Sequence, residues 1–164
     1  LDELVNQQLS KMLFANPQRI DYYDRYQEII DAYNAEQNRA TIEKTFMDLM
    51  ELASSLDTEQ QRYVREGFSS DEELSVYDLL FSENLTKQEI ETIKKVSVDL
   101  LTKIKQQIAK LDHWTDKQET KAIVDNLIRK TLWQELPNSY DVNDIQTYQK
   151  KIYEYVYMRY PEVA

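Results

Sequence analysis

The side chains that could do chemistry are few and widely spaced along the sequence. There is one histidine, His113, and no cysteine, so the chain has no thiol nucleophile, disulfide or thiolate metal site. His113 falls at an expected junction between helices, where capping or packing is its usual role. The densest acidic run, Asp71-Glu72-Glu73, opens an expected helix, and carboxylates there interact favourably with the helix dipole. Both features favour structural roles.

Two short patterns imitate nuclease motifs. Glu119-Thr120-Lys121 has the spacing of an E-x-K metal site, and Gln149 with Tyr153 has a Q-x-x-x-Y spacing. Both fall within expected helices, whereas the E-x-K of such nucleases lies on a strand beside an aspartate, so we reject them as sites. Gly67 is the one glycine, which excludes a G-x-x-x-x-G-K-[ST] phosphate loop. We therefore expect no catalytic residue, no metal site and no bound cofactor in this chain.

The elements that would position these residues are helical almost throughout. Apolar residues recur every three to four positions, and no stretch alternates as a strand would. The sequence predicts an all-α fold, a single irregular bundle of about eight helices over residues 1–164. No apolar run approaches the length of a membrane span. An amphipathic pattern is already present at Leu1, so we expect a C-terminal fragment of a longer subunit, with residues 1–15 leading in from a preceding domain.

Capping signals set the expected boundaries of these helices. The expected N-caps, in chain order, are Asn16 before Pro17, Asn38, Asp57 in a capping box with Gln60, Ser70, Thr86 in a capping box with Glu89, and Asp112 or Thr115. Gly67 is expected to end a short helix in a left-handed conformation. Two apolar faces are expected to pack inward. They are Ile42, Phe46, Leu49, Met50 and Ala53 on the third helix, and Ile123, Leu127, Ile128, Leu132 and Trp133 on the seventh.

The net charge of -10 is placed unevenly. Residues 1–82 hold 7 Lys/Arg against 17 Asp/Glu, whereas residues 83–164 hold 13 of each. The acidic half should repel a phosphate backbone, so any DNA contact is expected from the basic helices within residues 87–130. The DNA-contact candidates are Lys103, Lys105, Lys121, Arg129 and Lys130. A normal solvated helix face is the favoured explanation of these cations.

Twelve tyrosines form two clusters, one within residues 20–34 and one in the last helix. At helical spacing the first cluster fits the rim of a core, with wet hydroxyls. Alternating tyrosines in the last helix point in different directions, so some could face a partner, where tyrosine and arginine are enriched. The partner-interface candidates are Tyr153, Tyr157, Arg159 and Tyr160.

Several helix sequences carry a family resemblance. They are Asp21–Ile30 (DYYDRYQEII), Arg39–Phe46 (RATIEKTF), the stretch from Lys117-Gln118-Glu119-Thr120-Lys121 to Leu132-Trp133, Leu136-Pro137, and Tyr153–Tyr157 (YEYVY) with Tyr160-Pro161. Together they resemble the C-terminal helical domain of the restriction (motor) subunit of type I restriction-modification enzymes. The resemblance covers residues 16–161 and consists of helix patterns, not of a catalytic signature.

The resemblance implies an assembly role in a larger enzyme. In that family the nuclease and the ATP-driven motor that translocates and cleaves DNA lie in other domains, which would hold ATP and Mg²⁺. The fragment itself would be no enzyme, and would dock the motor subunit onto the methyltransferase and specificity subunits in a bacterial cytoplasm. Contact with double-stranded DNA stays open. The alternatives are a DNA-binding module through residues 87–130, or an unrelated helical ligand-binding bundle.

Overall fold

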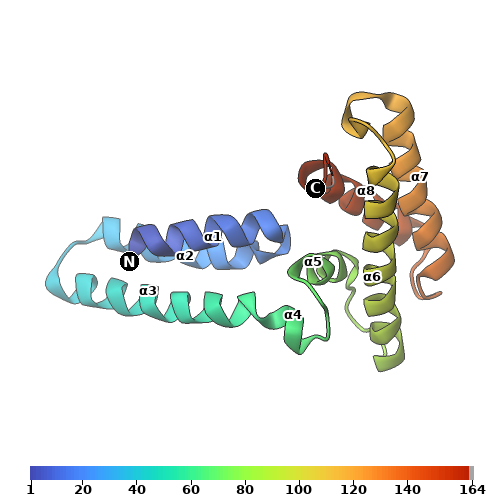
Figure 1. Ribbon diagram of the computed structural model, residues 1–164. Helices are drawn as coiled ribbons and strands as arrows, with labels where there is room; N and C mark the ends of the chain where they lie inside the picture. The colour runs from blue at the N-terminus through green and yellow to red at the C-terminus, as the bar shows by residue number, and fades with distance from the viewer. Residues whose placement is uncertain (163–164) are drawn as a thin grey trace. The chain divides into compact units, whose positions relative to one another are not determined.

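A computed structural model describes residues 1–162, which form an all-α fold and confirm the predicted class. Within those residues there are eight α-helices and no strand. The helices are α1 (Asp2–Ala15), α2 (Ile20–Ala35), α3 (Arg39–Gln60), α4 (Arg62–Arg65), α5 (Asp71–Leu80), α6 (Lys87–Ala109), α7 (Gln118–Glu135) and α8 (Val142–Arg159) (Figure 1). Short 3₁₀ turns, η1 (Pro17–Arg19) and η2 (Trp114–Asp116), precede α2 and α7. The chain divides into an N-terminal unit, Leu1–Ser75, and a C-terminal unit, Val76–Ala164. A single domain over residues 1–164 stays a prediction.

The N-terminal unit is built on three long helices, with α1 lying along α2 and α3 (Figure 1). Its core is a cluster of buried residues from each of them: Val5, Leu9 and Met12 of α1, Tyr26 of α2, and Leu49, Leu52 and Leu56 of α3. The three-to-four spacing places each set on one helix face, and full burial of one such side chain stabilises the fold by about 1.5–3 kcal/mol. The buried part of α3 therefore begins only at Leu49.

Local signals in the N-terminal unit mostly behave as predicted. Asn16 accepts a hydrogen bond from the Gln18 amide at 3.1 Å, and Asn38 caps α3 by accepting from the Thr41 amide at 2.9 Å. Gly67 has a φ of +87°, which confirms its left-handed conformation. The prediction of a capping box at Asp57 is wrong, because α3 continues through Asp57 to Gln60. Leu52, Leu56 and Glu59 are buried on one face of α3, and that packing outweighs the local capping signal.

The C-terminal unit is built on α6, α7 and α8, with α7 packed against both of the others. Its core includes residues without exposed surface from each helix, such as Ile93, Leu100 and Ile104 of α6, Ile128 and Leu132 of α7, and Ile152 and Val156 of α8. Trp114 of η2 is also fully buried. The buried residues of α6 thus recur every three to four positions, in line with the apolar spacing seen along the sequence.

Capping in the C-terminal unit confirms one prediction and corrects another. Thr86 and Glu89 form the predicted capping box at the start of α6, and Asp141 with Asp144 forms a second one at the start of α8. Neither Asp112 nor Thr115 caps α7, which begins after an extended Lys117. The residues before α7 instead form the 3₁₀ turn η2, in which Trp114 is buried. The Thr120 hydroxyl donates a 2.6 Å hydrogen bond to the Trp114 carbonyl.

Candidate interaction surfaces

The most buried charged group of the N-terminal unit is Arg19. Its Nε donates to Glu59 at 3.0 Å, and its two Nη atoms donate to both carboxylate oxygens of Asp71, at 3.0 and 2.6 Å. Glu59 also accepts hydrogen bonds from Arg62. All of these charges have opposite partners. The cluster therefore ties η1 to the end of α3 and the start of α5.

The pKa values in this cluster follow from the pairing. Burial alone would lower the pKa of Arg19, but hydrogen bonds and charge from Asp71 and Glu59 raise it. Burial alone would raise the pKa of Glu59, but hydrogen bonds from Arg62 and Arg19 lower it. Both groups are thus held in their charged forms. A charged group committed to oppositely charged partners in this way is a structural element and not a proton donor for chemistry.

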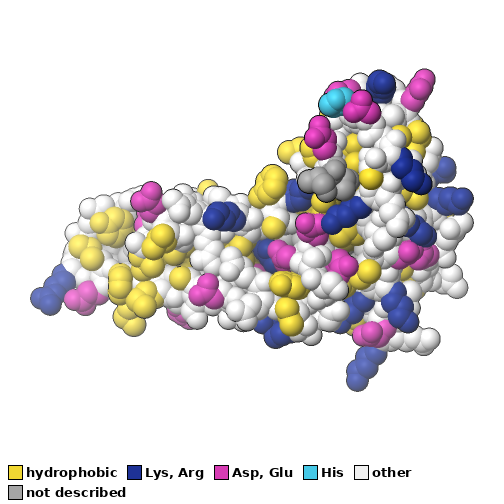
Figure 2. All heavy atoms as spheres, viewed as in Figure 1, with side chains coloured by type: hydrophobic (Ala, Val, Ile, Leu, Met, Phe, Trp, Pro, Cys, Tyr) yellow, Lys and Arg dark blue, Asp and Glu magenta, His cyan; other side chains and the backbone are white. Residues whose placement is uncertain are grey.

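An apolar strip lies on the N-terminal half of α3. Ile42, Phe46, Met47 and Met50, hereafter the α3 strip, are all exposed, with Phe46 at 55% and Met47 at 69%. Ile42, Glu43, Phe46 and Met47 line a shallow hollow there. Figure 2 shows the apolar side chains gathered at the end where α2 joins α3. The prediction that Ile42, Phe46 and Met50 pack inward is therefore wrong, because the core of α3 begins only at Leu49.

Three of the five cations predicted to contact DNA have partners in the C-terminal unit. Lys103 donates to Asp99 at 3.0 Å and to Glu135 at 3.1 Å, and these two carboxylates raise the pKa of Lys103. The Lys105 ammonium lies 5.5 Å from the centre of the Tyr160 ring. The Lys121 ammonium lies 5.9 Å from the centre of the Tyr157 ring. These cations are already engaged with their neighbours.

Arg129 and Lys130 differ from those three. Both are exposed on α7, and within residues 1–162 neither forms an ion pair. They line an open hollow together with Asn126, Trp133 and Gln134. Trp133 is 48% exposed and Ile123 is 42% exposed, which corrects the prediction that these two residues pack inward. The structure thus brings two of the predicted cations together with an indole ring that sequence reasoning assigned to the core.

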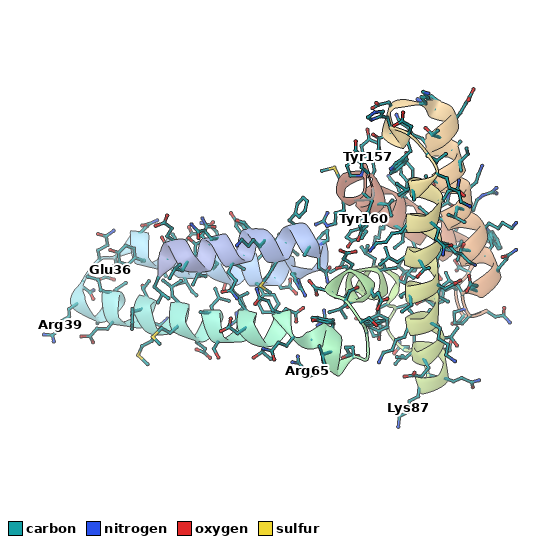
Figure 3. The ribbon with its side chains drawn as sticks, in the orientation of Figure 1. Glu36, Arg39, Arg65, Lys87, Tyr157 and Tyr160 are labelled. Atoms are coloured by element: carbon teal, nitrogen blue, oxygen red, sulfur yellow. The ribbon has the colours of Figure 1, made fainter. Side chains whose placement is uncertain are left out.

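The predicted interface tyrosines of α8 form an aromatic cluster with Trp114. The Tyr153 and Tyr157 rings each meet the Trp114 ring edge-on, with centroids 6.1 and 5.8 Å away. Tyr153 is half-buried, and burial raises its pKa. Tyr157 is exposed near the end of α8 (Figure 3). Of these two rings, Tyr157 is the one with surface left for a partner.

Arg159 and Tyr160 lie at the same end of α8. Tyr160 is buried, and its carbonyl accepts a 2.7 Å hydrogen bond from the indole nitrogen of Trp114. The Arg159 guanidinium lies 4.9 Å from the centre of the Tyr155 ring, and burial lowers the pKa of Arg159. Both residues thus make contacts at the end of the helix, Tyr160 through its backbone carbonyl. Their role in an interface stays a prediction.

With this geometry in view, comparison with known families gives a match over nearly the whole chain. Residues 1–160 match the family model described as "Type I restriction enzyme HindI endonuclease subunit-like, C-terminal". The chain belongs to this family. This confirms the resemblance inferred from the helix sequences. Comparisons with curated proteins and with solved structures found no match.

In the described part of this type I restriction subunit domain, the residues of the two nuclease-like patterns lie within helices. Glu119 and Lys121 lie within α7, and Gln149 of α8 donates a 3.0 Å hydrogen bond to Asp125. His113 is an exposed residue beside Asp112 and Glu162. Residues 1–162 contain no group of three His, Cys, Asp or Glu side chains that could hold a metal ion. No helix among them is both long and apolar enough to cross a membrane.

Sequence reasoning missed the α3 strip and Trp133 for one reason. Helical periodicity shows that a helix has an apolar face but not how far along the helix its neighbours extend. The sequence does carry one usable signal for the strip. Met47 extends the apolar face beyond the width that Leu49 and Ala53 need to pack inward. An unusually wide apolar arc on a helix with a polar opposite face is typical of a second contact surface.

Proposed function

We propose that this domain docks a type I restriction subunit onto its methyltransferase core, the methyltransferase and specificity subunits, through the α3 strip. Family membership supports a place in a multisubunit enzyme. The observation that carries the docking role is the exposure of four large apolar side chains on one helix face, since such patches mark interaction sites in monomeric domains. The domain itself does no bond chemistry. The ATP, the Mg²⁺ and the nuclease belong to other parts of the parent subunit, and the complex works in the cytoplasm.

Charge defines the partner surface further. Residues 1–75 carry 16 Asp/Glu and 7 Lys/Arg, an acidic excess for the whole unit, although Glu43 beside the hollow is itself paired with Arg39. A matching surface therefore has apolar residues at its centre and lysines or arginines at its rim. The apolar contact supplies most of the affinity, and the charges supply orientation and speed of association. The excess of acid also disfavours duplex DNA at this surface.

Binding of the chain to the purified methyltransferase core tests this proposal. We expect complex formation, and we expect F46S/M47S to weaken it at least tenfold, because truncating a central contact residue costs about 2 kcal/mol or more. L4S/V64S is the matched control, since Leu4 and Val64 are 67% and 62% exposed elsewhere in the same unit. Absence of binding by the unaltered chain rejects docking. Equal binding by F46S/M47S rejects the α3 strip as the docking surface.

The predicted α8 surface can be tested in the same assay. Tyr157 is the exposed member of the aromatic cluster, so Y157S should weaken binding if this end of α8 also meets the partner. Tyr160 is unsuitable for the test because it is buried. Unchanged binding by Y157S removes Tyr157 from the interface and leaves the α3 strip proposal intact.

A further inference from the structure

The exposed face of the C-terminal half of α7 combines charge with an aromatic ring. Asn126, Arg129, Lys130, Trp133 and Gln134 are separated by three- and four-residue steps, so they share one side of the helix. They line a single open hollow, and the indole of Trp133 keeps about half of its surface exposed. The ring is thus left in contact with solvent between two cations and two amides. We refer to these five residues as the α7 patch.

The charge of the α7 patch is not cancelled by its neighbours. Asp125 lies four residues before Arg129 but forms no ion pair with it, and its carboxylate accepts a hydrogen bond from Gln149 of α8. Glu135 follows it but forms an ion pair with Lys103 of α6. Arg129 and Lys130 precede the last turn of α7, which holds no basic residue, so the helix dipole explains neither the two cations nor the exposed indole ring.

Single-stranded nucleic acid offers partners for both features. Each nucleotide has a phosphate for a cation and a base whose flat face is uncovered, whereas duplex bases are covered by their neighbours. Proteins that bind single strands without sequence preference combine a basic surface with aromatic side chains on which bases stack. We propose that the α7 patch binds single-stranded DNA, with Arg129 and Lys130 on successive phosphates and the Trp133 ring stacked on a base. This contact is separate from the α3 strip and does not rest on the docking proposal.

The small size of the α7 patch determines the expected affinity for single-stranded DNA. Two cations contact two phosphates, so binding should be weak, with a Kd on the order of 10⁻⁴ M at physiological salt. The slope of log K against log salt should be about -1.4, since each contact to a single strand contributes about -0.7. Stacking on one base adds roughly tenfold. An isolated contact of this size would hold a strand that other parts of the subunit have already separated.

Tryptophan emission gives a readout specific to the patch. Trp114 is fully buried and Trp133 is exposed, so a stacked base should quench the emission of Trp133. We expect a short single-stranded oligonucleotide to quench the chain's fluorescence and its same-sequence duplex to do so much less. In W133F the quenching should vanish because the emitting ring is gone, and in W133A, which removes the stacking ring, the affinity measured by oligonucleotide anisotropy should fall roughly tenfold. Quenching that persists in W133F, or equal quenching by the duplex, overturns the proposal.

Charge-reversal variants distinguish binding at the α7 patch from a general electrostatic attraction between the chain and DNA. R129E/K130E should abolish binding, while K150E/K151E, with the same change of charge on exposed residues of α8, should bind within about twofold of the unaltered chain. An equal loss in both variants overturns the proposal. Polyglutamate tests an acidic protein partner: if it quenches Trp133 as strongly as the oligonucleotide does, the patch is a protein contact and the DNA assignment fails.

Discussion

Arg19 and Asp71 are 52 residues apart in the sequence, yet they form a two-pronged ion pair, with Nη2 2.6 Å from Oδ1 and Nη1 3.0 Å from Oδ2. Arg19 closes η1 and Asp71 opens α5, and both belong to the N-terminal unit. The guanidinium is 3% exposed, so it was removed from water to make this contact. Such a fork geometry fixes the orientation of both elements.

Removing the Arg19 side-chain charge should therefore destabilise the fold. We expect R19M to lower the free energy of unfolding by about 3 kcal/mol, because it removes one of the two partners of the buried Glu59 and the ion-pair partner of the half-buried Asp71. This is the lower end of the usual range, since Asp71 is 30% exposed and Glu59 keeps Arg62. Urea unfolding measures the change. R39M is the control: Arg39 pairs with Glu43 on the surface at 94% exposure, and its loss should cost less than about 0.5 kcal/mol.

The same cluster predicts a dependence of stability on pH. The pKa of Glu59 is lowered in the folded chain, so the unfolded chain binds the proton more readily. The stability contributed by Glu59 is thus fully present above its unfolded pKa of about 4.3 and is lost as pH falls through the lower folded value. Unfolding free energies measured from pH 7 downward should show E59Q losing less stability than the unaltered chain below pH 4.3. Parallel curves for the two proteins would contradict this.

The two helix starts in the C-terminal unit predict opposite results for similar substitutions. Thr86 accepts a 3.1 Å hydrogen bond from the Glu89 amide at the start of α6, so T86A should cost about 1 kcal/mol. Thr115 lies in the 3₁₀ turn before α7 and caps no helix, so T115A should stay within about 0.5 kcal/mol. Thermal unfolding of both variants checks this. A larger loss of stability in T115A would show that Thr115 caps α7 after all, as the sequence suggested.

The start of α7 shows where sequence reasoning reached its limit. Thr86 with Glu89 was predictable because a capping box is local, and α6 carries a long periodic face that agrees with it. Thr115 was one of two alternative caps suggested by the sequence, but the burial of Trp114 against Tyr153 of α8 and Tyr160 decided the backbone there. Contacts between residues far apart in sequence leave no trace in a local pattern. The start of α7 was therefore misplaced while the helix itself was predicted.

The candidate surfaces likewise divide into features that a local pattern predicts and features that depend on contacts between distant residues. Arg129 and Lys130 were predictable as cations of a basic helix, but only the fold shows that Lys103 is bound to Asp99 and Glu135 while these two have no ionic partner among the described residues. Trp133 and Phe46 fit the apolar periodicity of their helices and were assigned to the core. Their exposure depends on which helices lie against α7 and α3. Periodicity describes one helix at a time and carries no such information.

Trp114 provides a test of what fixes the end of α8. Its indole nitrogen donates a 2.7 Å hydrogen bond to the Tyr160 carbonyl, and the ring is fully buried. W114F keeps most of the packing but leaves that carbonyl without this donor, so it should cost about 1–3 kcal/mol. W133F is the matched control, because it makes the same substitution at an exposed tryptophan. It should lower the free energy of unfolding by less than about 0.5 kcal/mol. Urea unfolding gives both values, and hydrogen exchange at the last turn of α8 should be faster in W114F alone. Equal stability of the two variants would show that the side chain of Trp114 fills space there without anchoring the helix end.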